Sequence, residues 1–180
     1  MTETELEIEF LGGCYNRLCN MELSKVLYDC LAEAPKEAFT QEEKDFAHAL
    51  NQTMPELYEQ LRTKAYAPEG TDLHEGLLPI EPVDGYGSSD VGDVQHIVPG
   101  GSFSTACFAI GAPGHSWQNS ACSGHSLGLR GMIYASRVIA LFGLKVIENP
   151  DIVEKAKAEF VKETGGKPYI CPIPEELPIP

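Results

Sequence analysis

The sequence has few basic residues, and this scarcity limits the partners it can have. It carries 13 Lys and Arg against 27 Asp and Glu, a formal net charge of −14 at pH 7. Phosphate backbones and anionic lipid surfaces need Lys and Arg to neutralise them, so we expect neither a nucleic acid nor a membrane as partner. An uninterrupted apolar run near the ~20 residues of a membrane span is also lacking. The start, MTETELEIEF, has no basic leader. These absences predict a cytoplasmic protein.

Paired cysteine motifs are missing too. No Cys-x-x-Cys occurs among the six cysteines, and the closest pair, Cys14 and Cys19, has four residues between its members. Without a secretion signal, six reduced thiols are expected, with Cys30 and Cys107 inaccessible to thiol reagents. A cysteine nucleophile is the alternative. By the same argument, the glycosylation sequon at Asn51 is expected to be accidental.

The signatures of several catalytic and nucleotide-binding sites are also absent. There is no Gly-x-Ser-x-Gly elbow, which argues against a Ser-His-Asp triad built on Ser102, Ser104 or Ser116. Gly-x-Gly-x-x-Gly and Walker loops do not occur, and neither does His-Glu-x-x-His. The chemistry must therefore be sought in patterns without a standard local signature.

The patterns that are present predict a single core of α/β or α+β class. Leu6, Ile8 and Phe10 alternate with glutamates, which is typical of a half-buried strand. The apolar run FSTACFAI, residues 103–110, predicts a buried strand, and the short runs at 77–80 and 94–98 indicate further strands.

Helices are predicted from capping signals and apolar periodicity. Asn20 can cap a helix that stops before Pro35, and a capping box at Thr40 starts a second helix that must kink or break near Met54. Two more helices are expected at 128–143, with Met132, Ala135, Val138, Ile139 and Phe142 inward, and from Asn149 to the glycines at 165–166. The proline-rich end, 166–180, should be extended.

Carboxylates and imidazoles gather in glycine-rich loops, where the backbone can bend around an ion. Asp90, Asp93 and His96 lie in GYGSSDVGDVQH, and His115 and His125 lie in GAPGHSWQ and CSGHS. These residues could form a metal site. The aspartates could equally cap turns, His96 could be a satisfied histidine on a strand, and His115 could be a turn residue bonded to backbone. Trp117 is expected to pack.

Two of these loops resemble a known family. GSSDVGDV followed by GAPGHSWQ and a Gly-Met helix is similar to the C-terminal half of the dimetal amidohydrolase/carboxypeptidase superfamily, which includes glutamate carboxypeptidase and aminoacylase. Within that superfamily, the loops most resemble the p-aminobenzoyl-glutamate hydrolase branch. The resemblance covers most of the chain, and two motifs in the right order make it specific.

The resemblance implies a partial αβα catalytic sandwich at residues 36–165. It also implies that residues 1–35 are the last strand and helix of an inserted α+β lid, or dimerisation, domain. His115 matches a family metal ligand, and Ser89, Asp90 and Gly114 match positions that line the pocket. Asn20 matches a polar residue facing the active site. The implied cofactor is a divalent metal, zinc or manganese, and the implied substrate is a small amide of an N-acyl or aminobenzoyl amino acid.

The departures from the family pattern matter as much as the matches. Its His-x-Asp motif, bridging acid and Glu-Glu base have no counterpart here; the glutamates at 42–43 lie in an amphipathic helix. No catalytic base is expected within the chain, and one histidine cannot hold a metal tightly. We therefore expect an inactive C-terminal piece of an amidohydrolase that needs the missing N-terminal region and forms homodimers. The alternative is a non-catalytic interaction module that keeps only the fold.

Overall fold

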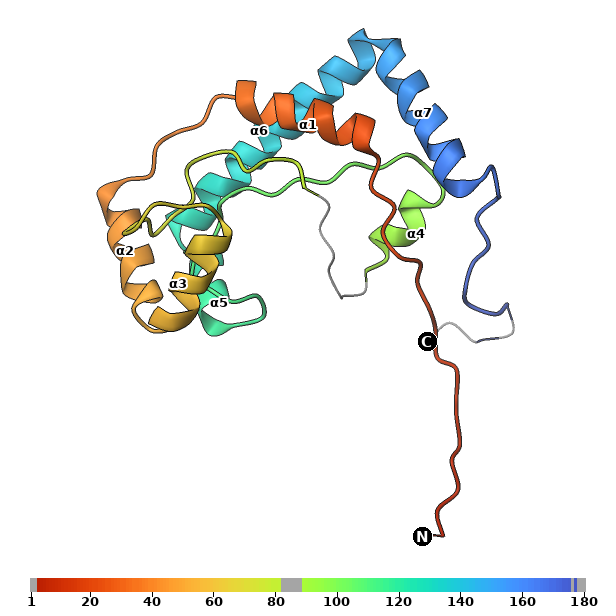
Figure 1. The fold of residues 1–180 in the computed structure, drawn as a ribbon, viewed down its shortest axis with the longest axis horizontal. Coiled ribbons are helices and arrows are strands. Elements are labelled where there is room, and N and C mark those ends of the chain that lie inside the picture. Colours follow the sequence, from red (N-terminus) through yellow and green to blue (C-terminus); the bar gives the residue numbers. More distant parts are fainter. Residues whose placement is uncertain (1–2, 82–88, 176, 178–180) are drawn as a thin grey trace.

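Seven helices make up about half of the residues that the computed structural model describes, which are 3–81, 89–175 and 177. In chain order they are α1 (Met21–Glu33), α2 (Gln41–Asn51), α3 (Pro55–Lys64), α4 (Val91–Gln95), α5 (Trp117–Ser123), α6 (Ser126–Glu148) and α7 (Pro150–Thr164). Figure 1 shows α1 lying along α6, with α7 folding back from the far end of α6. Helices α2, α3 and α5 gather around the start of α6 (Figure 1).

The helix ends follow the local signals in the sequence. Asn20 caps α1 by accepting a hydrogen bond from the Leu23 backbone N–H at 3.0 Å. Both bonds of the capping box between Thr40 and Glu43 are formed at the start of α2. The chain breaks between α2 and α3, where Pro55 takes the first helical position. These three predictions are confirmed.

The last helix is also placed as predicted, with one difference at its start. Gly165 ends α7 in the left-handed conformation, with φ of +62°. At the other end, the Asn149 side chain makes no cap bond to α7 and donates instead to the Lys145 carbonyl at 2.8 Å. Asn149 therefore closes α6 rather than opening α7.

Two apolar clusters form the core. One lies between α1 and α6 and contains Leu27, Cys30, Ala34, Tyr134 and Val138. The other joins α2, α5 and the start of α6 and contains Phe39, Ala47, Leu50, Leu73, Ala109, Cys122 and Leu127. The second cluster lies beneath the loop that carries His115, because Ala109 and Cys122 flank that loop in sequence.

The expected strands are not formed in the part of the chain that the structure describes. Residues 6–11 are extended and solvated, with Leu6 and Ile8 more than 80% exposed, and residues 103–110 have no ladder partner. An isolated parallel bridge joins Cys19 to Gly100. The prediction of strands at 6–11, 77–80, 94–98 and 103–110 is wrong for the described backbone, because a strand needs a neighbour to take its N–H and C=O groups. Residues 91–95 form α4 instead.

Helix α6 is apolar on two opposite faces, and the structure buries only one of them. Val138 is fully buried against α1, whereas Met132 and Ile139, which were expected to point inward, are more than half exposed. Among the described residues, α6 is the one helix long and apolar enough, by length and composition, to cross a membrane. A helix that is apolar all round is normally covered all round.

All six cysteines are free, and their burial predicts different reactivity. Cys30 and Cys122 are buried, and burial raises the pKa of both thiols. Cys14, Cys19 and Cys171 are exposed. In native protein at neutral pH, iodoacetamide should label Cys30 and Cys122 about 10-fold more slowly than the exposed three, because only thiolate that can be reached reacts.

Mass spectrometry of digested protein at several labelling times would measure these rates, and urea-unfolded protein, in which all six should react alike, is the control. Labelling of Cys122 as fast as Cys171 in folded protein would contradict this packing. Cys107, expected to be inaccessible, is only half-buried and should label at an intermediate rate.

Candidate functional site

The loop from Gly111 to Gln118 leaves the second core cluster and presents its polar side chains to solvent. Ala109 is buried, and the Ile110 backbone N–H donates to the Asp72 carbonyl at 3.0 Å. The Gly111 N–H donates to Oδ1 of Asn51 at 2.8 Å. A Cβ at Gly111 would lie 2.9 Å from both Asn51 Oδ1 and Tyr58 Cβ, so only glycine fits this approach.

Asn51 joins three segments at the base of this loop. Its side chain is fully buried, and besides accepting from Gly111 it donates to the carbonyl and the Oδ1 atom of Asp72, at 3.2 and 2.8 Å. Asp72 also contacts His48, Oδ2 to Nδ1, at 3.1 Å. A buried amide with all these partners holds the loop in register with the end of α2. Such an asparagine cannot also carry a glycan.

The far end of the loop is held just as closely. The Ser116 hydroxyl donates to the Pro113 carbonyl at 2.7 Å and accepts from the Asn119 N–H at 3.2 Å, which caps α5. Gln118 is buried and its amide donates to the Thr53 hydroxyl at 3.2 Å. The two ends of the loop are therefore fixed on the α2–α3 turn, and the central residues are left to project.

His115 projects from the middle of this loop. It is exposed and has a φ of +57°, in the left-handed region that side chains other than glycine seldom adopt. The unusual backbone path predicted from the flanking glycines and proline is confirmed. Gly114 beside it is exposed, with open space where a Cβ would be. Strain of this kind is found where a side chain is held for a function.

Trp117 lies next to His115 and does not pack as expected. Its side chain is 60% exposed, although it opens α5. The loop therefore offers an imidazole and an indole side by side to solvent, one able to bind a metal or a proton and the other able to cover an apolar or aromatic ligand.

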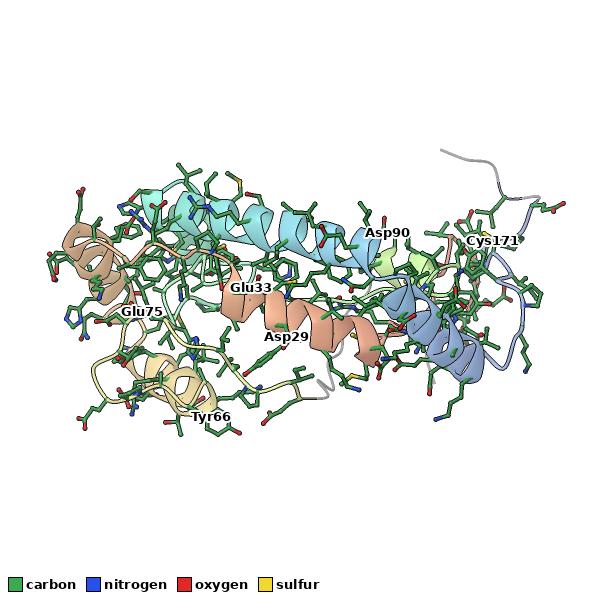
Figure 2. All side chains as sticks on the ribbon, turned by 90° about the horizontal axis from the view of Figure 1, so that it is seen from above. Asp29, Glu33, Tyr66, Glu75, Asp90 and Cys171 are labelled. Carbon is green, nitrogen blue, oxygen red and sulfur yellow. The ribbon has the colours of Figure 1, made fainter. Side chains whose placement is uncertain are left out.

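The other two pocket residues predicted for this site lie elsewhere. Ser89 and Asp90 are exposed at the start of α4, where the Ser89 hydroxyl accepts from the Val91 N–H at 3.2 Å. Figure 1 places α4 and α5 at opposite ends of the molecule. Figure 2 shows Asp90 at the end that holds Cys171, far from Tyr66, which follows α3. The structure does not bring Asp90 and His115 together.

Asn20, the remaining predicted pocket residue, is buried and uses its side chain inside the chain. Its Oδ1 caps α1, and its amide nitrogen donates to the Ala156 carbonyl of α7 at 2.9 Å. Its backbone N–H donates to Gly100 at 2.9 Å. Asn20 therefore joins α1, α7 and the segment around residue 100.

A second polar cluster forms around Asp93. Its Oδ1 accepts from the Tyr169 hydroxyl at 2.9 Å and its Oδ2 from the Tyr15 N–H at 3.3 Å. The hydrogen bond to Asp93, assisted by desolvation, raises the pKa of Tyr169. The His96 ring lies 4.5 Å from the Tyr15 ring, and its Nε2 atom is buried without a hydrogen-bond partner in the described structure. Asp93 therefore joins the C-terminal segment to the start of the chain.

Metal ligands are not gathered anywhere in the part of the chain that can be described. Within residues 3–81, 89–175 and 177, no three His, Cys, Asp or Glu side chains are placed to hold an ion together. His125, the third loop histidine, caps α6 through Nδ1 and stacks on Phe46 with ring centres 4.0 Å apart. Of the loop histidines, His115 is the exposed candidate ligand on a constrained backbone.

Comparison with known proteins gives an informative match. No family model matches the chain, and no solved structure does. A curated protein from Escherichia coli (strain K12) is 27% identical over 192 aligned residues, which cover 98% of this chain. The chain is similar to a subunit of p-aminobenzoyl-glutamate hydrolase. This confirms the resemblance inferred from the two loop motifs.

The match also sets the scale of the comparison. The chain spans about 40% of the length of the hydrolase subunit. The name of that relative agrees with the coarse expectation of an amide-cleaving protein that works in an assembly. The activity and partners of this chain itself remain proposals.

The sequence patterns gave no sign of most residues that hold the loop. They marked Asn51 only as a sequon, and they did not mark Thr53 or Gln118. A signal was present for Asn51, because it lies four residues after Ala47 on the apolar face of α2. A polar side chain on a buried helix face requires a partner, and such a residue is a candidate for a tertiary hydrogen bond.

Proposed function

We propose that this chain is the C-terminal part of a metal-dependent amidohydrolase that cleaves the amide bond of an N-acyl or aminobenzoyl amino acid. The observation that carries the proposal is similarity to a hydrolase subunit over 98% of the chain, together with a constrained loop that projects His115. The substrate class follows from the printed name of that relative. The cytoplasm is the proposed location, in keeping with the acidic surface and reduced cysteines.

The domain organisation is part of this proposal. Residues 1–35 are the end of a lid domain, 36–165 are the C-terminal half of an αβα catalytic sandwich, and 166–180 are an extended tail. Residues 6–11 and 103–110 become strands only when neighbouring strands are supplied by a polypeptide equivalent to the rest of the relative. The alternation of Leu6, Ile8 and Phe10 with glutamates supports this, because an apolar face on an extended segment is useful only when covered.

His115 is proposed as one ligand of zinc or manganese. Its ring is exposed and makes no hydrogen bond within the described structure, so a ring nitrogen is available to a metal. The described residues supply too few donors to hold an ion, and the remaining ligands and the general base must come from the partner polypeptide. A bound divalent metal would supply a water of lowered pKa. This chain would contribute the position of one imidazole, fixed by Asn51 and Gln118.

The pocket is proposed to include Gly114, Ser89 and Asp90, and to be faced by Asn20. Gly114 supports this directly, because its exposed backbone leaves room for a ligand beside His115. Ser89 and Asp90 would join the pocket only after α4 approaches the loop in the complete assembly. The assembly is also proposed to dimerise.

The test combines this chain with a polypeptide covering the part of the E. coli protein that the chain does not match. Hydrolysis of p-aminobenzoyl-glutamate should require both polypeptides and added zinc or manganese, and a chelator should abolish it. Removing a metal ligand should cost at least the effect of disturbing a ligand's supporting contacts, so His115→Ala should lower turnover by about 100-fold or more. His74→Ala, which alters a histidine on another loop, should leave turnover unchanged.

Equal activities of the His115→Ala and His74→Ala assemblies would contradict the ligand assignment. Hydrolysis that survives the chelator would contradict metal dependence. The second candidate function is a non-catalytic interaction module, and the separation of α4 from α5 favours it. A stable two-polypeptide assembly that never hydrolyses the amide under any metal would support that candidate.

A further inference from the structure

The outer face of α6 is the largest apolar surface that the structure leaves uncovered on one element. Tyr134 and Val138 point to the opposite side and are buried against α1. The outer face recurs every three or four residues along almost the whole helix and contains no charged side chain. This outer stripe consists of Leu129, Met132, Ile133, Ser136, Ile139, Ala140, Gly143, Leu144 and Ile147.

The arginines of α6 leave the outer stripe uncharged because they face the chain's own glutamates. Arg130 pairs with Glu43 and Glu37, each at 2.9 Å, and Arg137 pairs with Glu37 at 2.9 Å. Lys145, nearer the end, contacts Glu33 at 2.6 Å. A helix with three cations committed to one side and none on the other presents a dry, neutral surface to whatever covers it.

The total exposed surface indicates how large the covering partner must be. The structure exposes 12674 Å², whereas a folded monomer of its mass of 19.6 kDa should expose about 8,600 Å². The excess is about 4,000 Å², part of it from the extended first residues. A standard interface removes only about 800 Å² from each partner. A second copy paired along one helix would therefore leave most of the excess exposed, and a partner of domain size is needed.

We infer that the outer stripe of α6 is the docking face for a separate polypeptide that corresponds to the remaining part of the longer relative. The inference rests on the proposed function, which requires that polypeptide, and it names the surface that receives it. The match leaves about 60% of the relative without a counterpart here, which is enough chain for a domain-sized partner. A membrane is disfavoured as occupant because the net charge of −14 repels anionic lipid.

The experiment measures assembly rather than activity. This chain is titrated with the unmatched part of the E. coli protein, and complex formation is followed by analytical ultracentrifugation and calorimetry. The double substitution Met132→Glu with Ile139→Glu places two charges on the outer stripe and should weaken the affinity by about 100-fold or more. Val161→Glu, at an equally exposed apolar position on α7, is the matched control and should change the affinity less than about threefold.

The fold of each variant is checked separately by circular dichroism of the isolated chain. Met132 and Ile139 are exposed, so the double variant should keep its helix content. Equal weakening by the double variant and the control, or no complex with unmodified chain, overturns the inference. So does a self-dimer that the double variant dissociates, or binding to vesicles of phosphatidylcholine and phosphatidylglycerol that the double variant loses.

The outcomes also separate this inference from the proposed function. A complex that depends on the outer stripe but hydrolyses nothing leaves the docking face standing and removes the hydrolase. Amide hydrolysis by an assembly that is indifferent to Met132→Glu with Ile139→Glu does the reverse.

Discussion

Asn51→Asp is expected to destabilise the chain by about 3 kcal/mol or more at pH 7, measured as the free energy of unfolding in urea. The substitution keeps the shape of the side chain but replaces its amide donor with a carboxylate oxygen. That oxygen would face the Oδ1 atom of Asp72, which now accepts from the Asn51 amide at 2.8 Å. Two carboxylates in a buried site repel each other, and the Asp72 oxygens also lose a donor.

The pH dependence distinguishes this cause from a packing defect. Protonating either carboxylate removes the repulsion, so part of the lost stability should return as the pH falls below about 4 to 5. Gln52→Glu makes the same amide-to-acid change at the next, exposed position and should alter stability by less than about 0.5 kcal/mol. A loss that is the same for both variants, or is independent of pH, would argue against the Asn51 network.

The second large effect is expected for Glu43→Ala, which should cost about 3 to 5 kcal/mol of unfolding free energy. The Glu43 side chain is 1% exposed. It accepts from the Thr40 backbone N–H at 2.8 Å and from Arg130 Nε at 2.9 and 3.1 Å. Alanine would leave the Thr40 N–H without its cap and Arg130 with Glu37 alone.

Glu42→Ala, in the same first turn of α2 but exposed, is the control and should change stability by less than about 0.5 kcal/mol. Acid titration adds a second readout. Burial raises the pKa of Glu43, but the Thr40 N–H, the Ser126 hydroxyl and Arg130 together lower it below the usual value. Because the folded pKa is the lower one, the Glu43 contribution is present above the unfolded pKa and is lost as pH falls through the folded pKa. Glu43→Gln should reduce this acid sensitivity; an unchanged acid transition would contradict it.

Helix ends could be predicted because each depends on a few neighbouring residues. The capping box of Thr40 and Glu43, the break before Pro55 and the stop at Gly165 are all set within one turn of helix. Hydrogen bonds between residues three or four apart need no information about the rest of the fold.

Strands could not be predicted in the same way. Residues 6–11 and 103–110 carry the periodicity of strands, yet their hydrogen bonds must be made to a segment far away in sequence or in another polypeptide. Without such a neighbour in the described structure, residues 6–11 stay solvated. Periodicity reports which face of a strand would be covered, not whether anything covers it.

The candidate site divides along the same line. The constrained backbone at His115 followed from its local Gly, Pro and Gly neighbours, and its φ of +57° bears this out. The support of the loop by Asn51 and Gln118 was not predicted, because those contacts join residues 60 and 65 positions apart. Neither was the separation of Asp90 from His115 (Figure 2), since motif order says nothing about distance in space.

Helix α6 shows the division within a single element. Its sequence determined that the segment is a helix and that apolar side chains occupy two opposite faces. Only the tertiary structure decided that Val138 is covered and that Met132 and Ile139 are exposed, because α1 is present on one side. Burial is a property of two surfaces together, and the amino-acid sequence of one surface specifies only its readiness to be covered.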